Sequence, residues 1–364
     1  MERGKISALQ MAMLLYPAVL ATAILSMPSL TAQSAGRDMW MSPIFASITG
    51  FLAVYLAGSL HNMYPGKSVI QITEAVVGKM PGKVIGFFFF FFYLDLSGLS
   101  IRSYSDFIVT SFLFTTPQTV VISSMVLLCA LCVYSGLEVM ARVGQLLFPL
   151  FVLPILIAII FLVPDLQPKN MLPVLENGWL PPLKGAIPPS GWFSEFFIIA
   201  FLLPYLSDVK KGMKYGLTVV LGVMISLVIV NFMVLFVLGE STANKLYPLM
   251  NVGRYSRAGF FENMEAVIMA VWIVGAFVKT SLFYYICSLV IAQWLNLSDH
   301  RPVVWPLGIL IVQFSFWATP STMAISRFDF LTFPYYSATI QLLLPLLLLL
   351  IAFVRKRKKK KSAV

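Results

Sequence analysis

Four ionisable side chains lie inside long apolar runs, and they are the residues of this sequence best placed to do chemistry. Asp95 and Arg102 share one run, Glu195 lies near the start of a second, and Lys279 lies midway through a third. A charged group at membrane depth is costly, so it faces the protein interior or a water-filled cavity and marks a ligand, ion or proton site. The four residues therefore indicate binding, with a role for Lys279 as a fixed cation, a ligand partner or a proton carrier.

Each of these charges also has a purely structural interpretation. Asp95 and Arg102 are seven residues apart, so they share a helical face but are too distant to pair directly. Arg102 and Asp106 have the i,i+4 spacing of a local ion pair. Asp95 and Lys279 fit an interhelical ion pair, and Glu195 fits a solvated position at the membrane interface. The sequence leaves these interpretations open beside ligand binding.

The composition of the chain explains why charged residues inside its apolar runs are exceptional. Of 364 residues, 59% are hydrophobic and only 11% are charged, and the mean hydropathy is +0.88. A soluble domain of this size cannot hide so much apolar surface. A helix needs about 20 mostly apolar residues to cross a bilayer, and this chain supplies such runs repeatedly. The composition therefore predicts a polytopic membrane protein.

Hydropathy windows of about 19 residues predict ten membrane-spanning helices. The expected spans are Leu9–Leu30, Pro43–His61, Val84–Phe114, Thr119–Ser135, Val143–Val163, Trp192–Leu206, Tyr215–Leu238, Ala266–Ala292, Val303–Thr319 and Tyr336–Val354. With both termini cytoplasmic, most Lys and Arg residues fall on the inner side, as the positive-inside rule requires.

The basic character of the chain is concentrated at its end, where every residue from Arg355 to Lys361 is Lys or Arg. This run directly follows the last apolar span, a position that favours an anionic-lipid anchor on the inner leaflet over nucleic-acid binding. We therefore expect a ten-helix permease-like domain over residues 1–354 and a basic cytoplasmic tail over residues 355–364.

Signals for enzyme chemistry are weak in this sequence. Cys129 and Cys132 form a CxxC pair, but they lie within an apolar span where a reactive thiolate is disfavoured, and we interpret them as packing residues. The sequence contains no phosphate-binding loop, dinucleotide fingerprint, HExxH or Gly-x-Ser-x-Gly motif. We expect no catalytic residue, cofactor or metal.

Two of the predicted spans, the first and the sixth, contain signals for a broken helix. The first carries small residues around Thr22, followed by Pro28, and the sixth is interrupted by Pro204. Interrupted spans at matching places in two five-helix halves are the sequence pointer to an inverted-repeat transporter site. The expected fold class is thus an all-α integral membrane bundle of two inverted five-helix repeats with discontinuous helices 1 and 6.

Several motifs give the chain a family resemblance. Ala21-Thr22-Ala23-Ile24 with Pro28 resembles the Gly-x-Gly-Ile…Pro motif of the amino acid–polyamine–organocation transporters, although alanines stand where those relatives usually have glycines. Further along, the order of motifs resembles that of the spore germination permeases, the B subunits of germinant receptors in endospore-forming bacteria. The residues that carry this likeness are Leu172-Pro173-Val174-Leu175, Gly178, Leu183, Gly185, Pro248, Arg254, Phe261, Glu262, Glu265, Trp272, Phe277, Lys279 and Tyr284.

The resemblance implies a central site surrounded by spans one, three, six and eight. A ligand carboxylate would meet backbone N–H groups of Ala21, Thr22, Ala23 and Ile24, and its ammonium would face carbonyl groups between Phe201 and Pro204. Lys279, Thr280 and Leu96 would shape the side-chain pocket. Asp95, Arg102 and Lys279 are the candidates for an intramembrane charge pair or a gating group.

Two functions remain open at this stage. The family likeness implies a receptor subunit in the inner membrane of the bacterial spore, which binds a small germinant, an amino acid, and signals to A-type and C-type partner subunits. The fold equally permits a secondary amino acid transporter, with or without proton coupling, because fold alone does not decide function.

Overall fold

The computed structural model describes residues 4–255, 264–317 and 321–361, and within them the chain forms helices joined by short connections, with no β-strand. A single isolated bridge joins Ile6 to Leu206. The elements are α1 (Ala8–Ala35), η1 (Gly36–Met41), α2 (Ser42–Met63), α3 (Val69–Val77), α4 (Lys79–Ser111), α5 (Gln118–Tyr134), α6 (Leu137–Leu162), η2 (Val163–Asp165), η3 (Pro168–Met171), α7 (Leu180–Gly185), α8 (Ile187–Ser194), η4 (Glu195–Ile198), α9 (Ile199–Leu202), η5 (Leu203–Tyr205), α10 (Val209–Leu238), η6 (Gly239–Asn244), α11 (Pro248–Tyr255), α12 (Met264–Trp294), α13 (Arg301–Trp317), α14 (Thr322–Leu331), α15 (Phe333–Ala338), the π-helical η7 (Thr339–Leu343) and α16 (Leu344–Lys361).

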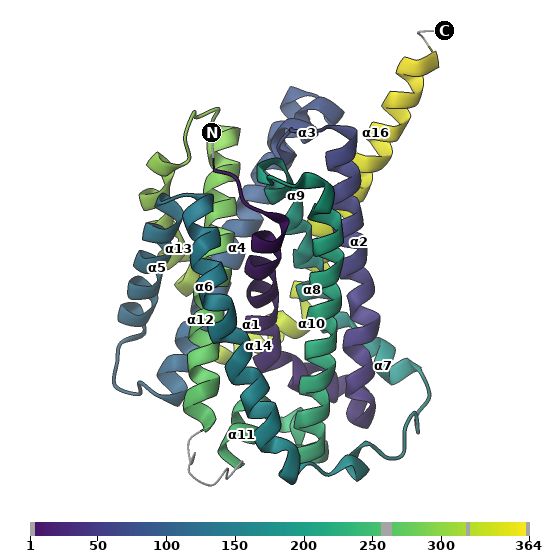
Figure 1. The fold of residues 1–364 in the computed structure, drawn as a ribbon, viewed down its shortest axis with the longest axis vertical. Helices are drawn as coiled ribbons and strands as arrows, with labels where there is room; N and C mark the ends of the chain where they lie inside the picture. The colour runs from purple at the N-terminus through teal and green to yellow at the C-terminus, as the bar shows by residue number, and fades with distance from the viewer. Residues whose placement is uncertain (1–3, 256–263, 318–320, 362–364) are drawn as a thin grey trace.

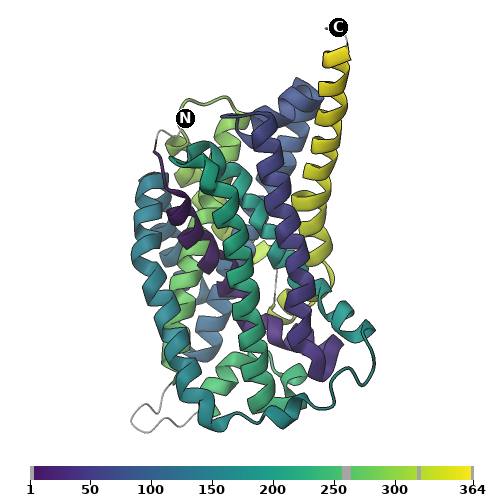
Figure 2. The ribbon, with the colours of Figure 1, turned by 45° about the vertical axis from the view of Figure 1, so that its right-hand side comes forward.

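The helices confirm the predicted ten-span architecture. In the part of the chain that the structure describes, seven helical stretches are long and apolar enough to cross a membrane, and the first of them, Ala8–Met63, includes both α1 and α2. The shorter apolar helices α5 and α13 complete the ten. Both termini lie at the same end of the bundle, here called the terminal side (Figures 1 and 2).

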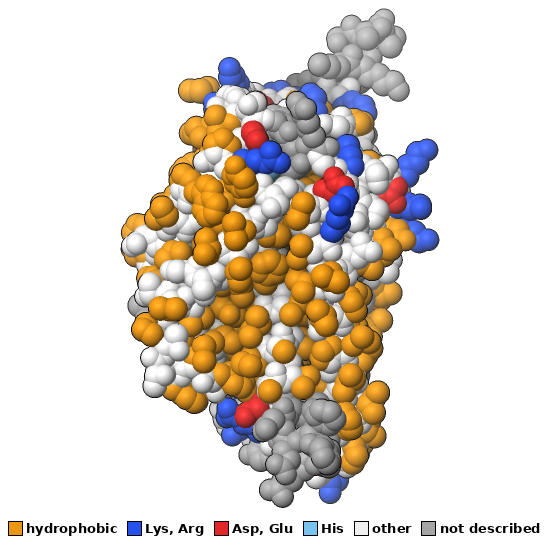
Figure 3. Space-filling view, turned by 60° about the vertical axis from the view of Figure 1, so that its left-hand side comes forward, with side chains coloured by type: hydrophobic (Ala, Val, Ile, Leu, Met, Phe, Trp, Pro, Cys, Tyr) orange, Lys and Arg blue, Asp and Glu red, His pale blue; other side chains and the backbone are white. Residues whose placement is uncertain are grey.

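The surface agrees with a membrane protein. Hydrophobic side chains form a broad band around the middle of the face in Figure 3, whereas Lys, Arg, Asp and Glu gather toward its two ends. Large exposed apolar side chains within the helices include Leu146, Ile160 and Ile309. Such side chains are stable against lipid and would be unfavourable against water. The chain is therefore an integral membrane protein.

The first span differs from the prediction in one respect, because α1 is helical at every residue from Ala8 to Ala35. Ser7 begins it with a capping box, and Pro17 and Pro28 lie inside the helix. Proline cannot donate a backbone N–H, so Pro28 leaves the Ile24 carbonyl oxygen without its usual intrahelical donor. The expected interruption at Ala21–Ile24 is absent here, since alanine favours the helical conformation that glycine would weaken.

The sixth span is broken, as predicted. It runs through α8, the 3₁₀ segment η4, the single turn α9 and the 3₁₀ segment η5, so its helical geometry changes at Glu195, at Ile199 and at Leu203. Pro204 explains the last change, because its ring removes a donor and disfavours a continuing helix. The first change has no proline, and it places Glu195 at the start of a tighter turn.

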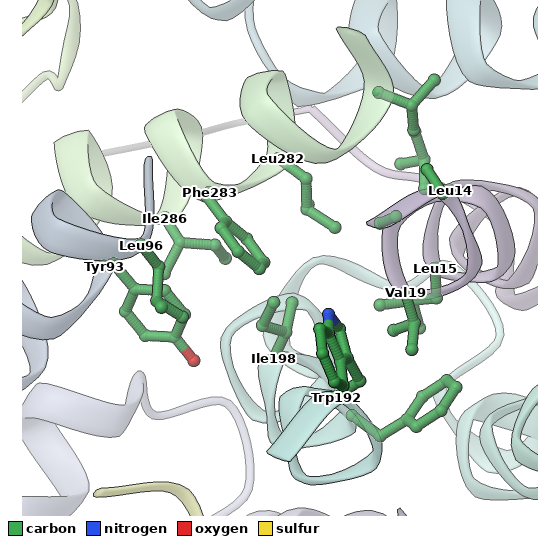
Figure 4. Packing of buried hydrophobic residues seen from close by; sticks show 14 of the residues in the cluster. Leu14, Leu15, Val19, Tyr93, Leu96, Trp192, Ile198, Leu282, Phe283 and Ile286 are labelled. Atoms are coloured by element: carbon green, nitrogen blue, oxygen red, sulfur yellow. The ribbon is translucent and has the colours of Figure 1, made fainter. Parts of the chain in front are cut away.

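The core of the bundle forms around α1. Helix α1 lies near the middle of the molecule and packs against α10 and α12, while α12 also packs against α4 (Figure 1). Figure 4 shows Val19 of α1 near Trp192 of the sixth span, with Leu282 and Phe283 of α12 on the other side of the same apolar core. These are the spans that were expected to enclose a central site.

Helix α14 was not predicted. It follows α13 at an angle of 93° and lies at mid-height of the bundle, where it packs against α4, α8 and α15 (Figure 1). Ser321 caps it, with its hydroxyl accepting a hydrogen bond from the backbone N–H of Ala324. The described part of the predicted ninth span is α13, and the short helix α14 stands between it and the tenth span, which begins at α15.

On the terminal side, the first residues are hydrogen-bonded to the end of the sixth span, and we call this set of contacts the terminal clamp. Ile6 donates its backbone N–H to the Tyr205 carbonyl and accepts from the N–H of Ser207, at 3.0 and 2.9 Å. The Lys5 ammonium donates to the Pro204 carbonyl, and Asp208 accepts the N–H of Ala8. Backbone hydrogen bonds thus tie the start of α1 to the segment that joins η5 to α10.

Candidate functional site

A small cavity lies between the first, third, sixth and eighth spans and α14. Its volume is about 70 Å³, room for about five water molecules if each takes about 10–15 Å³. Most of its wall is apolar or hydroxylic, and three charged side chains line it. The lining residues are Thr22, Leu25, Ser26, Leu96, Leu99, Ser100, Ser103, Trp192, Glu195, Leu246, Tyr247, Trp272, Lys279, Thr322, Ile325, Ser326, Phe328, Asp329 and Phe333.

One wall of the cavity is a buried polar cluster centred on the Lys279 ammonium. The ammonium donates to both carboxylate oxygens of Glu195, at 2.9 and 2.8 Å, and to the Thr22 hydroxyl at 2.8 Å. The Trp192 indole N–H donates to the same hydroxyl at 3.0 Å. The side chains of Lys279 and Glu195 are only 3% and 1% exposed. We call these four residues the Lys279 cluster, and it joins the first, sixth and eighth spans.

A close approach of two helices brings the cluster together. A Cβ atom built on Gly275 of α12 would lie 2.5 Å from the Ala21 Cβ and 2.6 Å from Cε2 of Phe151. Only glycine fits at that point, one turn before Lys279. The glycine at this close approach of α1 and α12 therefore lies on α12, opposite Ala21 of α1.

The charged groups of the cluster are hydrogen-bonded to one another, but burying them has a large desolvation cost. The Lys279 ammonium lies 5.0 Å from the centre of the Phe283 ring, which adds a cation–π contact to its three acceptors. Removing two charges from water costs several kcal/mol for each ion, and their attraction offsets this only when the geometry is good. Such a pair is weak evidence for stability, so its position on a cavity wall points to a role in binding or switching.

Two predictions about these charges were wrong. Glu195 is buried and paired with Lys279, and it is not solvated at the interface, because the break at η4 turns it into the bundle. Asp95 does not pair with Lys279 and is instead hydrogen-bonded to Tyr336 of α15. The i,i+4 pair of Arg102 with Asp106 is confirmed at 3.4 Å.

The other expected ligand-binding residues divide into two groups. Thr22, Leu96 and Lys279 line the cavity. Phe201 lies elsewhere and packs against Phe89 and Tyr93 in the core, and the Pro204 carbonyl belongs to the terminal clamp.

The remaining expected residues of the first and eighth spans do not reach this cavity. Ala21 and Ala23 are buried in α1, and Ile24 lines a second cavity, which is apolar and lies beside α6 and α10. Thr280 is buried in α12, and its hydroxyl has no hydrogen-bond partner in the part of the chain that the structure describes.

Sequence reasoning missed Asp329, the third charged side chain of the cavity. It lies on α14 and interacts electrostatically with both Lys279 and Glu195. The same helix also contacts the Arg102–Asp106 pair, since the Thr322 hydroxyl donates to the Asp106 carboxylate. The sequence does contain a signal for this helix: a capping serine, Ser321, is followed by two apolar residues three positions apart, Ile325 and Phe328.

A second buried polar chain starts next to the cluster. The Ser194 and Ser337 hydroxyls are 2.6 Å apart, and Ser337 accepts a hydrogen bond from the Gln341 amide at 2.8 Å. The Tyr93 hydroxyl donates to the side-chain oxygen Oε1 of Gln341 at 3.3 Å. Gln341 lies in the π-helical turn η7, a distortion that is frequent at functional sites. These bonds connect the break of the sixth span to the last helix.

The fold and the site together define a class of protein, the integral membrane proteins of the amino acid–polyamine–organocation type, with a ten-helix core of two inverted repeats. A similar solved structure is that of MhsT, a LeuT-fold transporter in complex with L-phenylalanine, which matches 97% of this chain and 99% of its own with a TM-score of 0.61. The two sequences are 14% identical, so the likeness concerns the fold.

The chain belongs to the spore germination protein family, whose model matches residues 5–323. Spore germination protein KB of Bacillus subtilis (strain 168) is 24% identical over 320 residues, covering 86% of this chain and 84% of that protein. Spore germination protein YndE of the same organism is 24% identical over 314 residues, with 85% of each chain covered. The family resemblance seen in the sequence is confirmed, although two of its residues, Phe261 and Glu262, lie outside the described residues.

Proposed function

We propose that this protein is the membrane subunit of a spore germinant receptor, which binds a small germinant, an amino acid, in the central cavity and signals to A-type and C-type partner subunits. The observation that carries the proposal is the Lys279 cluster, a buried ion pair that joins three spans at the wall of a cavity. Family membership supports the receptor role, and the LeuT-type fold supports an amino-acid-sized ligand site.

The cluster offers a physical route from binding to signalling. A ligand carboxylate competes with Glu195 for the Lys279 ammonium. This exchange weakens the contact between the sixth and eighth spans, so a conformation in which these spans separate gains population. The polar chain from Ser194 to Gln341 then connects that movement to α16, whose last turns extend beyond the bundle.

The setting of the receptor follows from the same proposal. Both termini face the cytoplasm, and the membrane is the inner membrane of the bacterial spore. The basic run from Arg355 to Lys361, which forms the last turns of α16, lies against the anionic inner leaflet, where each Lys or Arg contributes about 1 kcal/mol of attraction. Contacts with partner subunits fall on the faces of the ten-helix domain that lipid would otherwise cover.

A secondary amino acid transporter is the second candidate, and the similarity in fold to MhsT favours it. The two functions share ligand binding and differ in whether the site later opens to the terminal side. A transporter must break the terminal clamp in every cycle, whereas a receptor signals without doing so.

Proteoliposomes that contain this chain alone separate the two functions. Radiolabelled amino acids are tested for binding and for uptake, with and without a proton gradient. Saturable binding without uptake is the expected result for the receptor, and Lys279→Met should abolish it. Gradient-driven uptake would establish a transporter, and the absence of both binding and uptake would refute an amino acid site in this chain.

A further inference from the structure

The charges that line the central cavity do not balance. Lys279 is matched by Glu195 at 2.8 Å, and Asp329 adds a second carboxylate to the same cavity. Every other lining side chain is neutral. With all three groups ionised, the cavity carries one uncompensated negative charge. An unpaired charge at membrane depth is unfavourable, so a bound cationic group that supplies the missing charge gains the interaction that the protein leaves open.

Asp329 is placed to receive such a group. Its carboxylate makes no hydrogen bond within the described residues, although it interacts electrostatically with Lys279 and Glu195. By contrast, the carboxylate of Asp106 accepts hydrogen bonds from Gln118 and Thr322, and that of Asp95 is hydrogen-bonded to Tyr336. Asp329 is thus the carboxylate of this region whose acceptor capacity is still free.

A second group in the cavity also lacks a partner. The Trp272 side chain is buried, with 3% of its surface exposed, and its ring stacks on Tyr104 at a centroid distance of 5.6 Å. Its indole N–H has no acceptor in the part of the chain that the structure describes. A buried donor without an acceptor is unfavourable, because it has lost its hydrogen bond to water. The cavity therefore presents a free anionic acceptor and a free neutral donor.

We infer that the cavity selects its ligand through a positively charged amine, which pairs with Asp329, while the Trp272 indole N–H donates a hydrogen bond to a ligand oxygen. This inference rests on the proposed function, because it specifies the ligand of the same site. It assigns the recognition of the amine to α14 and not to carbonyl groups of the sixth span. Ligands that carry the amine bind as zwitterions or as cations, and anions are excluded.

The test uses the purified full-length chain in lipid nanodiscs and the change of melting temperature on adding ligand. The twenty standard amino acids are screened in choline chloride, and the tightest binder is then compared with its amide, which is cationic, and with its N-acetyl derivative, which is anionic. We expect the amino acid and the amide to bind and the N-acetyl derivative to bind at least tenfold more weakly.

Variants then assign the amine to Asp329. Asp329→Asn should weaken binding of the amino acid and the amide by about tenfold to a hundredfold, in line with the loss of a charge-assisted hydrogen bond. Trp272→Phe should weaken binding by a smaller factor, about fivefold. Glu138→Gln and Trp179→Phe, at exposed positions, are the matched controls. If Asp329→Asn does not fold, the ligand series on the wild-type chain decides the question.

Four outcomes would overturn the inference. Equal binding by wild type and Asp329→Asn, or equal binding of the amino acid and its N-acetyl derivative, would remove the amine contact and leave the proposed function intact. Stabilisation of wild type, and not of Asp329→Asn, by sodium chloride alone would make Asp329 an inorganic cation site. Failure of all amino acids and derivatives to bind would refute the proposed function and the inference together.

Discussion

Among the residues that the structure describes, two buried ion pairs differ in how they are built. Arg102 and Asp106 are one turn apart on α4, and their side chains are 9% and 6% exposed. Lys279 and Glu195 come from different spans, 84 positions apart in the chain, and are still more deeply buried. The first pair moves with its helix as one unit, whereas the second pair lasts only while two spans stay together.

The difference shows which pair can report on conformation. Asp106 keeps further hydrogen bonds from Gln118 and Thr322, so its charge is supported by neighbours on other helices. Glu195 depends on Lys279 alone among the described residues, since both of its carboxylate oxygens accept from that ammonium. A change at the Lys279 cluster is therefore expected to affect both stability and ligand response, and a change at Arg102 to affect mainly stability.

The largest effect is expected from Lys279→Met. This change leaves the Glu195 carboxylate buried without its partner, which typically costs about 3–5 kcal/mol of unfolding free energy. Denaturant unfolding of the purified chain measures the loss. The double variant Lys279→Met with Glu195→Gln removes both charges and should recover most of the stability without restoring ligand binding. Equal stability of the single and double variants would contradict the pairing.

The next effect tests the helix approach that assembles the cluster. Gly275→Ala puts a methyl group 2.5 Å from the Ala21 Cβ and 2.6 Å from Phe151. We expect a loss of about 3 kcal/mol, the upper range for overpacking, together with weaker ligand binding, since α12 must move away from α1. Adding Ala21→Gly to this variant should restore part of the stability and part of the ligand binding. The absence of any rescue would argue against the contact between positions 275 and 21.

Arg102→Met should cost less, about 2 kcal/mol, because Asp106 retains two neutral donors after the arginine is lost. Ligand affinity should change less than twofold, since Arg102 does not line the cavity. Calorimetric binding and denaturant unfolding on one preparation separate the two readouts. A loss of binding as large as that of Lys279→Met would remove the contrast between the pairs.

The smallest effect is expected from the Thr22 hydroxyl. Thr22→Val removes an acceptor from Lys279 and Trp192, but water from the adjacent cavity can replace it, so the expected loss of stability is about 1 kcal/mol. Thr22→Ser keeps the hydroxyl and should behave like the wild type. A loss with serine equal to that with valine would indicate that the methyl group, and not the hydrogen bonds, matters.

The sequence predicts the spans because lipid demands long apolar runs, a requirement that no tertiary contact overrides. It also places Lys279, Thr22 and Leu96 on spans that surround the cavity. It fails for Glu195 and Asp329, whose polarity fits a loop or an interface equally well. The 3₁₀ turn η4 places Glu195 in the interior, and α14 places Asp329 at the cavity. Both placements depend on contacts between segments that are distant in the sequence.

The prediction for the first span fails for a related reason. Proline and small residues near Thr22 permit an unwound segment, but alanine also favours a helix, and the local sequence does not decide between them. The glycine that allows the close approach is Gly275, on a helix more than 250 positions away. Sequence motifs locate small residues, whereas only the packed structure shows which of two facing helices must supply them.

The terminal clamp has a consequence for genetics. Its central hydrogen bonds join main-chain atoms of Ile6 to Tyr205 and Ser207, so most single substitutions leave them in place. Under the proposed function, point mutants selected for defective germination should carry many changes at the Lys279 cluster and few at the terminal clamp. Proline at position 6 is the informative exception, because it deletes the donor to Tyr205 and leaves the rest of the strand-like contact intact.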